Sequence, residues 1–417
     1  MTADKNPRKK LTYIDLFAGA GGLSEGFIRN KYTPIAHVEM DVDACNTLKT
    51  RMAYHHLKKI NKIDSYLDYL QGNVDRVELY RRVPAEIIKS VLPYEISKNN
   101  IRDIFRDIFL SMKQIGSNEV DIIVGGPPCQ AYSKVGRAAR ISREDKRNYL
   151  YREYAKFLIE YRPKLFVFEN VPGLYTANKG EHYKNLRKYF KRIGYCVEDR
   201  LLDAADFGVL QRRKRIIFIG WRKDLIFTYP DFEKIANRWT VNCLFHDLPF
   251  LKAGEEVLRA KYRAPSNEYL DRFEIRNGID FVTHNLSRPH NVKDLRIYRR
   301  AVELWEKHRR RLRNNEIPES ERTQKNVTSF LDRFKVVVRD NLSHTILAHI
   351  SKDGHHYIHP DKNQLRSLTV REAARIQSFP DDYFFEGTRN SAFRQIGNAV
   401  PPLMAEAIAK KIKEFIS

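Results

Sequence analysis

Short apolar runs alternate with amphipathic stretches through the first half of the chain. Apolar runs of this length, bounded by glycine, proline and polar residues, predict β-strands at 12–17, 34–38, 120–124, 165–168 and 215–219. The stretches between them favour helices, of which 42–57 and 149–161 are the clearest. Strands separated by helices predict an α/β fold with a doubly wound, mostly parallel sheet. Functional loops should then follow the carboxyl ends of the strands.

The remaining segments break this rhythm. Residues 75–117 are mainly helical in pattern and charged, which we interpret as an inserted helical excursion. Residues 241–365 are irregular and rich in Arg, Lys, His and aromatic side chains, with one helix-like stretch at 296–313. This composition predicts a smaller second domain. The end of the chain, 400–416, reads as an amphipathic helix that follows two prolines.

Charge points to the kind of partner. Lys and Arg total 75 against 52 Asp and Glu, a net charge of +23. Such a surplus is typical of proteins that bind a polyanion, usually nucleic acid, although solvated surface charge explains it equally well. The four cysteines are far apart and form no CxxC pair, which argues against a disulfide framework or a zinc site. No apolar segment approaches the roughly 18 residues of a membrane span, and Asp15 interrupts the early apolar run, so we expect a cytoplasmic protein.

A glycine-rich loop at 17–22 joins the first strand to the next helix. Glycines there let the backbone approach a ligand, and an acid after the second strand, Glu39 or Asp41, can accept hydrogen bonds from ribose hydroxyls. The pair predicts an adenosine-containing cofactor. The loop lacks the GxGxxG spacing expected for NAD, and a plain tight turn with solvated acids is the alternative.

Cys129 follows two prolines at the end of the 120–124 strand. Proline restricts the backbone just before the thiol, so Cys129 is held where a thiolate nucleophile would be useful. A buried structural cysteine is the alternative. Residues 132–146, with several Arg and Lys, suit a loop that closes over a phosphate backbone. Glu169 ends the next strand and should face the same crevice, while Arg213 and Arg215 share one face of an extended segment.

Seven of these segments, in this order, resemble the motifs of one family, the cytosine-5 DNA methyltransferases of the bacterial modification-methylase type. They are residues 15–22, 39–41, 126–130, 169–171, 211–215, 366–372 and 395–402. Each motif is weak alone, but a chance match of the ordered set is very improbable.

The resemblance implies a Rossmann-like S-adenosylmethionine-dependent methyltransferase fold and a chemistry without metal. The target cytosine is swung out of the duplex, and the Cys129 thiolate adds to carbon-6 of its ring. Glu169 holds or donates a proton at N3, and Arg215, with Arg213 as a second candidate, holds the base carbonyl oxygen. The resemblance gives a predicted cofactor set: Phe17, Ala18, Gly19, Gly21, Gly22, Glu39, Met40, Asn73, Pro128, Leu150 and Asn398. Asn73 is the weakest member, because it stands where the family usually has an acid beside the adenine.

The resemblance also predicts the domain plan. Residues 1–240 and 388–417 would form the catalytic and cofactor-binding domain, with the last helix packed back beside the first strand. Residues 241–387 would form the target-recognition domain and its hinge. Predicted DNA contacts are Gln130, Ser133, Arg137, Thr369 and Arg371, the last two also bracing the hinge. Double-stranded DNA is the expected partner of a monomeric enzyme of the bacterial cytoplasm or nucleoid, with a paired restriction endonuclease in the same system.

Two other functions compete with this one. An RNA cytosine methyltransferase could use the same framework, although the long basic segment 241–365 argues for duplex DNA. A non-catalytic DNA-binding regulator could keep the fold, but the intact set of Cys129, Glu169 and Arg215 argues against it.

Overall fold

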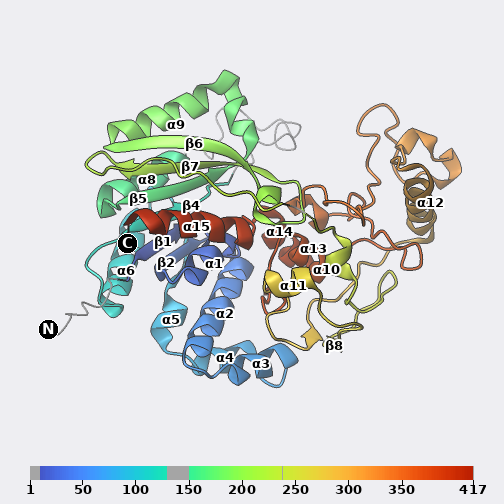
Figure 1. The fold of residues 1–417 in the computed structure, drawn as a ribbon, viewed down its shortest axis with the longest axis horizontal. Coiled ribbons are helices and arrows are strands. Elements are labelled where there is room, and N and C mark those ends of the chain that lie inside the picture. The colour runs from blue at the N-terminus through green and yellow to red at the C-terminus, as the bar shows by residue number, and fades with distance from the viewer. Residues whose placement is uncertain (1–9, 129–149, 237, 417) are drawn as a thin grey trace.

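A seven-stranded sheet organises the larger part of the molecule (Figure 1). The computed structural model describes residues 10–128, 150–236 and 238–416. The strand order is β3-β2-β1-β4-β5-β7-β6, and the five strands from β3 to β5 run parallel. Its strands are β1 (Thr12–Leu16), β2 (Thr33–Glu39), β3 (Val91–Pro93), β4 (Ile122–Gly125), β5 (Leu165–Asn170), β6 (Tyr195–Asp203) and β7 (Lys214–Arg222).

The chain reverses direction across the sheet between β1 and β4. Strands β2 and β3 lie on one side of β1, and β4 and β5 on the other, so the crevice beyond the carboxyl ends of β1 and β4 is the expected ligand site. Strand β7 is antiparallel to β5. The first residues of β7 therefore reach the same edge of the sheet at which β5 ends.

Helices cover both faces of the sheet. Apolar residues of α1 and α15 form one core with it, and those of α6, α8 and α9 form a second on the opposite face. The helices of this part are α1 (Gly22–Arg29), α2 (Val42–Lys59), α3 (Asp64–Gln71), α4 (Arg76–Arg81), α5 (Ala85–Lys89), α6 (Ile101–Gln114), α8 (Leu150–Tyr161), α9 (Glu181–Arg192) and α15 (Pro402–Ile416). The predicted doubly wound α/β fold is confirmed.

The end of the chain packs against its beginning. A Cβ on Gly26 of α1 would lie 2.3 Å from the carbonyl carbon of Ala405, so only glycine allows α15 to approach α1 this closely. The hydroxyl of Tyr32 donates to the carbonyl of Ala409 at 3.0 Å. The expectation that the last helix returns to the first βα unit is confirmed.

The interpretation of residues 75–117 as an insertion is wrong in one respect. The segment is mostly helical, but it also contributes β3, which pairs in parallel with β2 at the sheet edge. A three-residue strand ending in proline gives little period-two signal, so the pattern of the sequence did not reveal it.

The smaller part of the molecule lies to one side of the sheet (Figure 1). Its elements are α10 (Asn242–Phe245), β8 (Ala260–Lys261), α11 (Glu268–Arg272), β9 (Phe281–Val282), α12 (Val292–His308), α13 (Val370–Ile376) and α14 (Arg389–Asn398). Helices α10, α11 and α13 share the core of the α1 face, whereas α12 packs on a separate core drawn from residues 297–358. The predicted boundaries at 240 and 388 stay a prediction. Among the described residues, no helix is long and apolar enough to cross a membrane.

Buried histidines should make this smaller part sensitive to acid. Burial lowers the pKa of His359 and of His290 to about 3, and that of His344 to about 4. The unfolded chain takes up protons near the ordinary value of about 6.5. Because the folded-state pKa values are depressed, the stability is complete above about pH 6.5 and is lost as pH falls towards 4.

We therefore expect the free energy of unfolding to drop by about 1–3 kcal/mol per pH unit between pH 6 and 4.5. Urea unfolding followed by the fluorescence of Trp305, which packs against the α12 core, measures this change. A free energy of unfolding that stays constant from pH 7 to 4.5 would contradict it.

Candidate active site

The glycine loop between β1 and α1 is strained at its start. Phe17 has φ 56°, a left-handed conformation that costs a bulky residue free energy. A Cβ on Gly19 would meet nothing within 4 Å, so this part of the loop borders open space. Gly21 and Gly22 are different, because a Cβ would lie 2.7 Å from Leu48 or 2.2 Å from the carbonyl oxygen of Val400. The absence of a side chain at these two positions allows close packing. Only their backbone groups are available to a ligand.

Glu39, at the end of β2, is tied to this loop. One carboxylate oxygen accepts from the amide of Gly19 at 2.7 Å. The other accepts from the amides of Met40 and Asp41, both at 2.8 Å. The side chain of Asp41 caps α2 by accepting from the amide of Ala44 at 3.0 Å. Of the two acids predicted from the sequence, Glu39 is thus the one that faces the glycine loop.

Asp15 adds a second acid next to this loop, and its role was missed by the sequence reasoning. Its side chain is buried, and among the described residues its Oδ2 atom has no hydrogen-bond partner. Burial, and next the negative charge of Glu39, raise the pKa of Asp15 well above its ordinary range. Burial therefore favours the neutral form of Asp15, and only a nearby cation would favour its charged form.

Glu169 and Arg215 meet at the carboxyl edge of the sheet. The Nε atom of Arg215 lies 2.6 Å from a carboxylate oxygen of Glu169, and both side chains remain slightly exposed. The pair forms because the antiparallel β7 begins where β5 ends. A Cβ on Gly126 would lie 2.6 Å from the other oxygen of Glu169, so this glycine leaves room for the carboxylate. The predicted neighbourhood of the proline loop, Glu169 and Arg215 is thus present.

Arg213 lies elsewhere, although it is only two residues from Arg215. Its guanidinium is fully buried and donates to the carbonyls of Ile346 at 2.7 Å, Gly397 at 3.0 Å and Ala399 at 2.8 Å. The predicted contact between Arg213 and the carbonyl oxygen of the base is therefore wrong. The irregular turn before β7, where Arg213 bonds to Asp203 through its amide, breaks the alternation that an extended segment would have.

Other residues of the predicted cofactor set lie at or beside the ends of helices and strands. Asn398 is exposed at the end of α14, between the two carbonyls that Arg213 holds. Met40 is exposed after β2, Pro128 is exposed after β4, and Leu150 begins α8. Ala18 continues the β1 turn and donates its amide to the carbonyl of Val38 at 3.1 Å.

The position predicted for Asn73 is wrong. Asn73 follows helix α3, and its side-chain nitrogen donates to the side-chain oxygen of Gln71 at 3.2 Å. The strand beside β2 is β3, which ends at Pro93. The residues that reach the cofactor edge of the sheet here are therefore Tyr94 and Glu95.

The predicted DNA contacts at Thr369 and Arg371 are also wrong, because both side chains are fully buried. Thr369 caps α13 by accepting from the amide of Glu372 at 3.1 Å. Arg371 donates to the hydroxyl of Thr283 at 2.7 Å and to the carbonyl of Tyr383 at 3.0 Å. Their predicted bracing role agrees with these contacts. The neighbouring Arg375 pairs with two buried acids of the same region.

Four predicted site residues, Cys129, Gln130, Ser133 and Arg137, lie outside the described residues. Their assignments stay predictions from the sequence.

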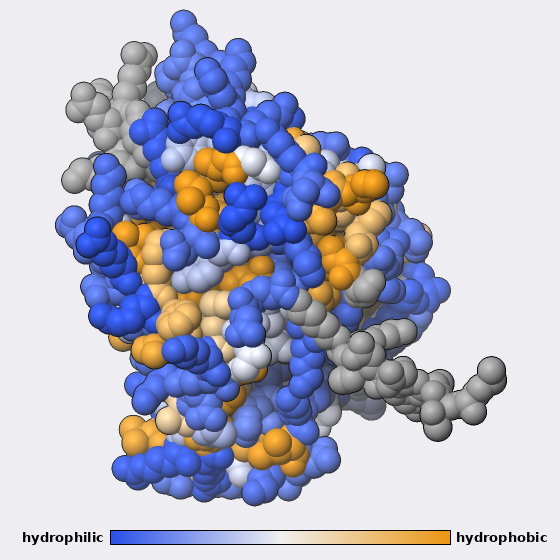
Figure 2. Space-filling model, turned by 90° about the vertical axis from the view of Figure 1, so that its left-hand side faces the viewer, coloured by the Kyte–Doolittle hydropathy of each residue, from blue (hydrophilic) through white to orange (hydrophobic). Residues whose placement is uncertain are grey.

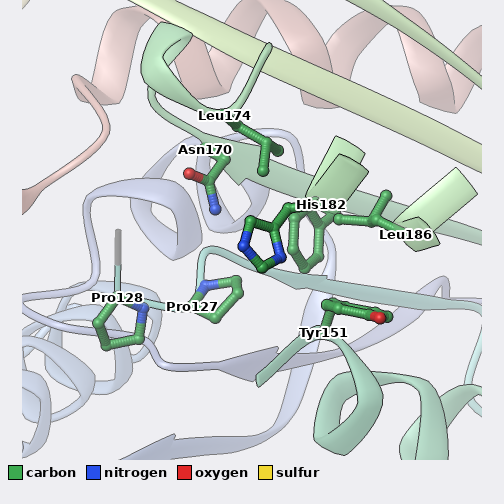
Figure 3. Close-up of a pocket in the computed structure, with 8 residues that line it drawn as sticks. Pro127, Pro128, Tyr151, Asn170, Leu174, His182 and Leu186 are labelled. Carbon is green, nitrogen blue, oxygen red and sulfur yellow. The ribbon is translucent and has the colours of Figure 1, made fainter. Parts of the chain in front are cut away.

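A pocket opens beside the proline loop (Figure 3). Its lining includes Pro127, Pro128 and Asn170, with the imidazole of His182 near its centre. Burial lowers the pKa of His182, so its neutral form is favoured. The sequence offered no signal for His182, which comes from the start of α9 far along the chain. Among the described residues, no cluster of His, Cys, Asp and Glu could hold a metal ion.

Comparisons with known proteins cover nearly the whole chain. Residues 11–77 and 86–414 match the model of a family described as C-5 cytosine-specific DNA methylase. The type II methyltransferase M.Bpa9945I of Bacillus paralicheniformis is 42% identical, over 97% of this chain and 99% of its own length. The type II methyltransferase M1.HphI of Haemophilus parahaemolyticus is 31% identical, over 96% of this chain and 86% of its own length.

Solved structures share the fold. A chain described as a DNA modification methyltransferase encoded within a prophage of E. coli superposes with a TM-score of 0.64 at 22% identity. It covers 98% of this chain and 99% of its own. The methyltransferase EhMeth of Entamoeba histolytica gives a TM-score of 0.55 at 15% identity, over 98% of this chain and 100% of its own.

Proposed function

Because the chain belongs to the C-5 cytosine-specific DNA methylase family, we propose that it methylates carbon-5 of a cytosine within a specific sequence of double-stranded DNA, with S-adenosylmethionine as the methyl donor. One observation supports this proposal most directly. The Glu169–Arg215 ion pair lies at the sheet edge beside Gly126. Gly126 precedes Cys129 by three residues in the sequence. An acid and a guanidinium at this place can polarise a pyrimidine ring that a thiolate attacks.

The residues divide the reaction between them. The Cys129 thiolate forms a bond to carbon-6, and the electron pair of the ring moves towards N3 and the base carbonyl. Glu169 supplies a proton at N3, and Arg215 stabilises the charge that develops on the carbonyl oxygen. S-adenosylmethionine supplies the methyl group that carbon-5 takes up. A water molecule then takes the carbon-5 proton, the ring double bond reforms as Cys129 leaves as a thiolate, and N3 returns its proton to Glu169.

The crevice suits the charge of this cofactor. S-adenosylmethionine carries a sulfonium and an ammonium group. Glu39 provides a carboxylate at the end of β2, and the buried Asp15 on β1 would ionise beside a positive charge. A pyrophosphate such as that of NAD would be repelled here. We assign the ribose to Glu39, the backbone contacts to the loop at Gly19 and the positive charge to Asp15. Exposed Asn398 and Met40 border the same place.

We further propose that Arg213 acts through Asn398, because its guanidinium fixes the carbonyls of the residues on both sides of it. Replacing Arg213 with lysine is expected to weaken S-adenosylmethionine binding by about 10-fold, since lysine offers no planar fork for three carbonyls. Titration calorimetry with the cofactor measures this effect. Affinity for DNA should change much less.

A double-mutant cycle tests the route of that effect. If Arg213 acts through Asn398, the combined R213K/N398A variant should bind cofactor no more weakly than N398A alone. Arg212, which is exposed, provides the control variant R212K with unchanged affinity. Full additivity of the two substitutions would contradict the assignment.

The relatives suggest the biological setting. Both relatives above are type II methyltransferases, which supports a role in a restriction–modification system and a paired endonuclease. The net charge of +23 favours a polyanionic substrate. We place the enzyme with its DNA in the bacterial cytoplasm or nucleoid and expect it to work as a monomer.

Mass spectrometry of digested nucleosides tests the function. Unmethylated duplex DNA incubated with the protein and S-adenosylmethionine should yield 5-methylcytosine, whereas transfer RNA treated in parallel should not. Methylation of the RNA alone would favour the competing RNA enzyme. Tight DNA binding without any methylated base would favour a regulator.

A further inference from the structure

A loop beyond α12 is held in a defined shape by one buried amide. Asn314, in the 3-10 helix η5 (Asn314–Glu316), is almost fully buried. Its side-chain nitrogen donates to the carbonyls of Gln324 at 3.0 Å and Asn326 at 2.6 Å. Its backbone amide donates to the carbonyl of Leu331 at 2.7 Å. Both ends of the 324–331 loop are therefore fixed to the same residue.

Inside the loop, Asn326 makes the turn. Its side-chain oxygen accepts from the amides of Thr328 at 3.0 Å and Ser329 at 2.9 Å. Its nitrogen donates to the hydroxyl of Ser329 at 2.7 Å. These contacts fix the turn through polar groups of the loop itself.

The loop uses this framework to present a phenyl ring to solvent. Phe330 is 72% exposed and has φ 53°. A left-handed conformation costs a bulky residue roughly 1–3 kcal/mol, and exposure of the ring forfeits the burial that normally offsets such a cost. An exposed aromatic side chain on a fixed, strained turn is typical of a contact surface for a partner.

The surroundings indicate the chemistry of that partner. Lys325 and Arg333 flank the ring in sequence, and among the described residues neither forms an ion pair. A run of arginines, 309–311, precedes η5, and each of the three pairs with an acid. The outer face of α12 carries exposed Arg296 and Arg299. Cationic side chains around an exposed aromatic ring fit a polyanion with planar bases.

We propose that the 324–331 loop is a DNA-contacting loop of the target-recognition region and that Phe330 inserts its ring into the base stack of the bound duplex. This inference rests on the proposed function. A cytosine that leaves the duplex must unstack from its neighbours, and apolar wedges between base steps lower the cost of such a distortion. Phe330 would supply that wedge, while Lys325 and Arg333 contact phosphates. Asn314 acts as a positioning residue that keeps the loop ready before DNA binds.

Replacing Phe330 with alanine tests the proposal in the full-length protein. Loss of one stacking contact should weaken binding to the target duplex by about 5- to 100-fold in fluorescence anisotropy, with S-adenosylmethionine affinity unchanged. Tryptophan at this position should keep near-normal binding, whereas leucine should not. The N314A variant, which retains the ring but frees the loop, should show a smaller loss in the same direction.

Phe109 provides a matched control. It is 51% exposed on α6. Figure 2 shows the side of the molecule that lies on the left in Figure 1, where apolar patches are separated by hydrophilic surface. The F109A variant should bind DNA as the wild type does. A duplex with a mismatch at the target cytosine, which is already partly unstacked, should reduce the defect of F330A.

Three outcomes would overturn the inference: F330A that binds the duplex as tightly as the wild type, leucine that fully replaces Phe330, or a defect that F109A shares. Failure of the wild type to methylate any duplex would instead count against the proposed function. The two failures are therefore distinguishable.

Discussion

Replacing Cys129 with alanine is expected to abolish methyl transfer, with kcat reduced by at least about 10⁴-fold, as is usual when a covalent nucleophile is removed. Without the thiolate, carbon-5 of cytosine is not nucleophilic enough to take up a methyl group. Nucleoside digestion after incubation with duplex DNA measures the loss. Affinities for S-adenosylmethionine and DNA should stay within a few-fold of the wild type, because the Glu39 loop and the basic second part of the molecule are unchanged.

Cys196 gives the matched control for this substitution. It lies half-buried on β6, away from the carboxyl ends of β1 and β4. The C196A variant should retain full activity. A C129A protein that still produces 5-methylcytosine would refute the nucleophile assignment, and an equal loss in C196A would indicate a general effect of cysteine removal.

The sequence was sufficient for five of the seven strands of the central sheet, and the reason lies in how these strands are buried. Strands β3 and β6, at the two edges of the sheet, were not predicted. Strand β4 and most of β5 are covered on both faces, so each reads as an apolar run that ends at a glycine or an acid. Strand β1 is equally buried, although Asp15 interrupts its apolar run. The same rule put Glu39 and Glu169 at strand ends. Their meeting with Gly19 and Gly126 follows from the parallel order of the strands.

The errors have a common physical origin. Asn73, Arg213 and Arg371 were assigned from local motifs, whereas their contacts come from segments far away in the sequence. The place predicted for Asn73 belongs to the residues that follow the short strand β3. This strand is recognised only by its pairing with β2. Arg213 and Arg371 carry charges, and charges are usually exposed, but here backbone carbonyls surround them. The local composition of a segment does not reveal such long-range hydrogen bonds.

Substitution of Glu169 with glutamine should give the second large effect, a fall in kcat of about 10²- to 10⁴-fold, the range for loss of a general acid. The amide keeps the size of the side chain and can still accept from Arg215, but it cannot give a proton to N3. KM for DNA should change little. Steady-state kinetics with a duplex substrate separates the two parameters.

The pocket geometry supplies an independent way to disturb the same group. A Cβ at position 126 would lie 2.6 Å from the free oxygen of Glu169, so G126A should displace the carboxylate and also lower kcat. Glu198, exposed on β6, provides the control variant E198Q with normal activity. If Glu169 activates the ring for attack, E169Q should also slow covalent trapping of Cys129 by a duplex that contains 5-fluorocytosine. Trapping at the wild-type rate with a low kcat would move the role of Glu169 to a step after the addition of Cys129.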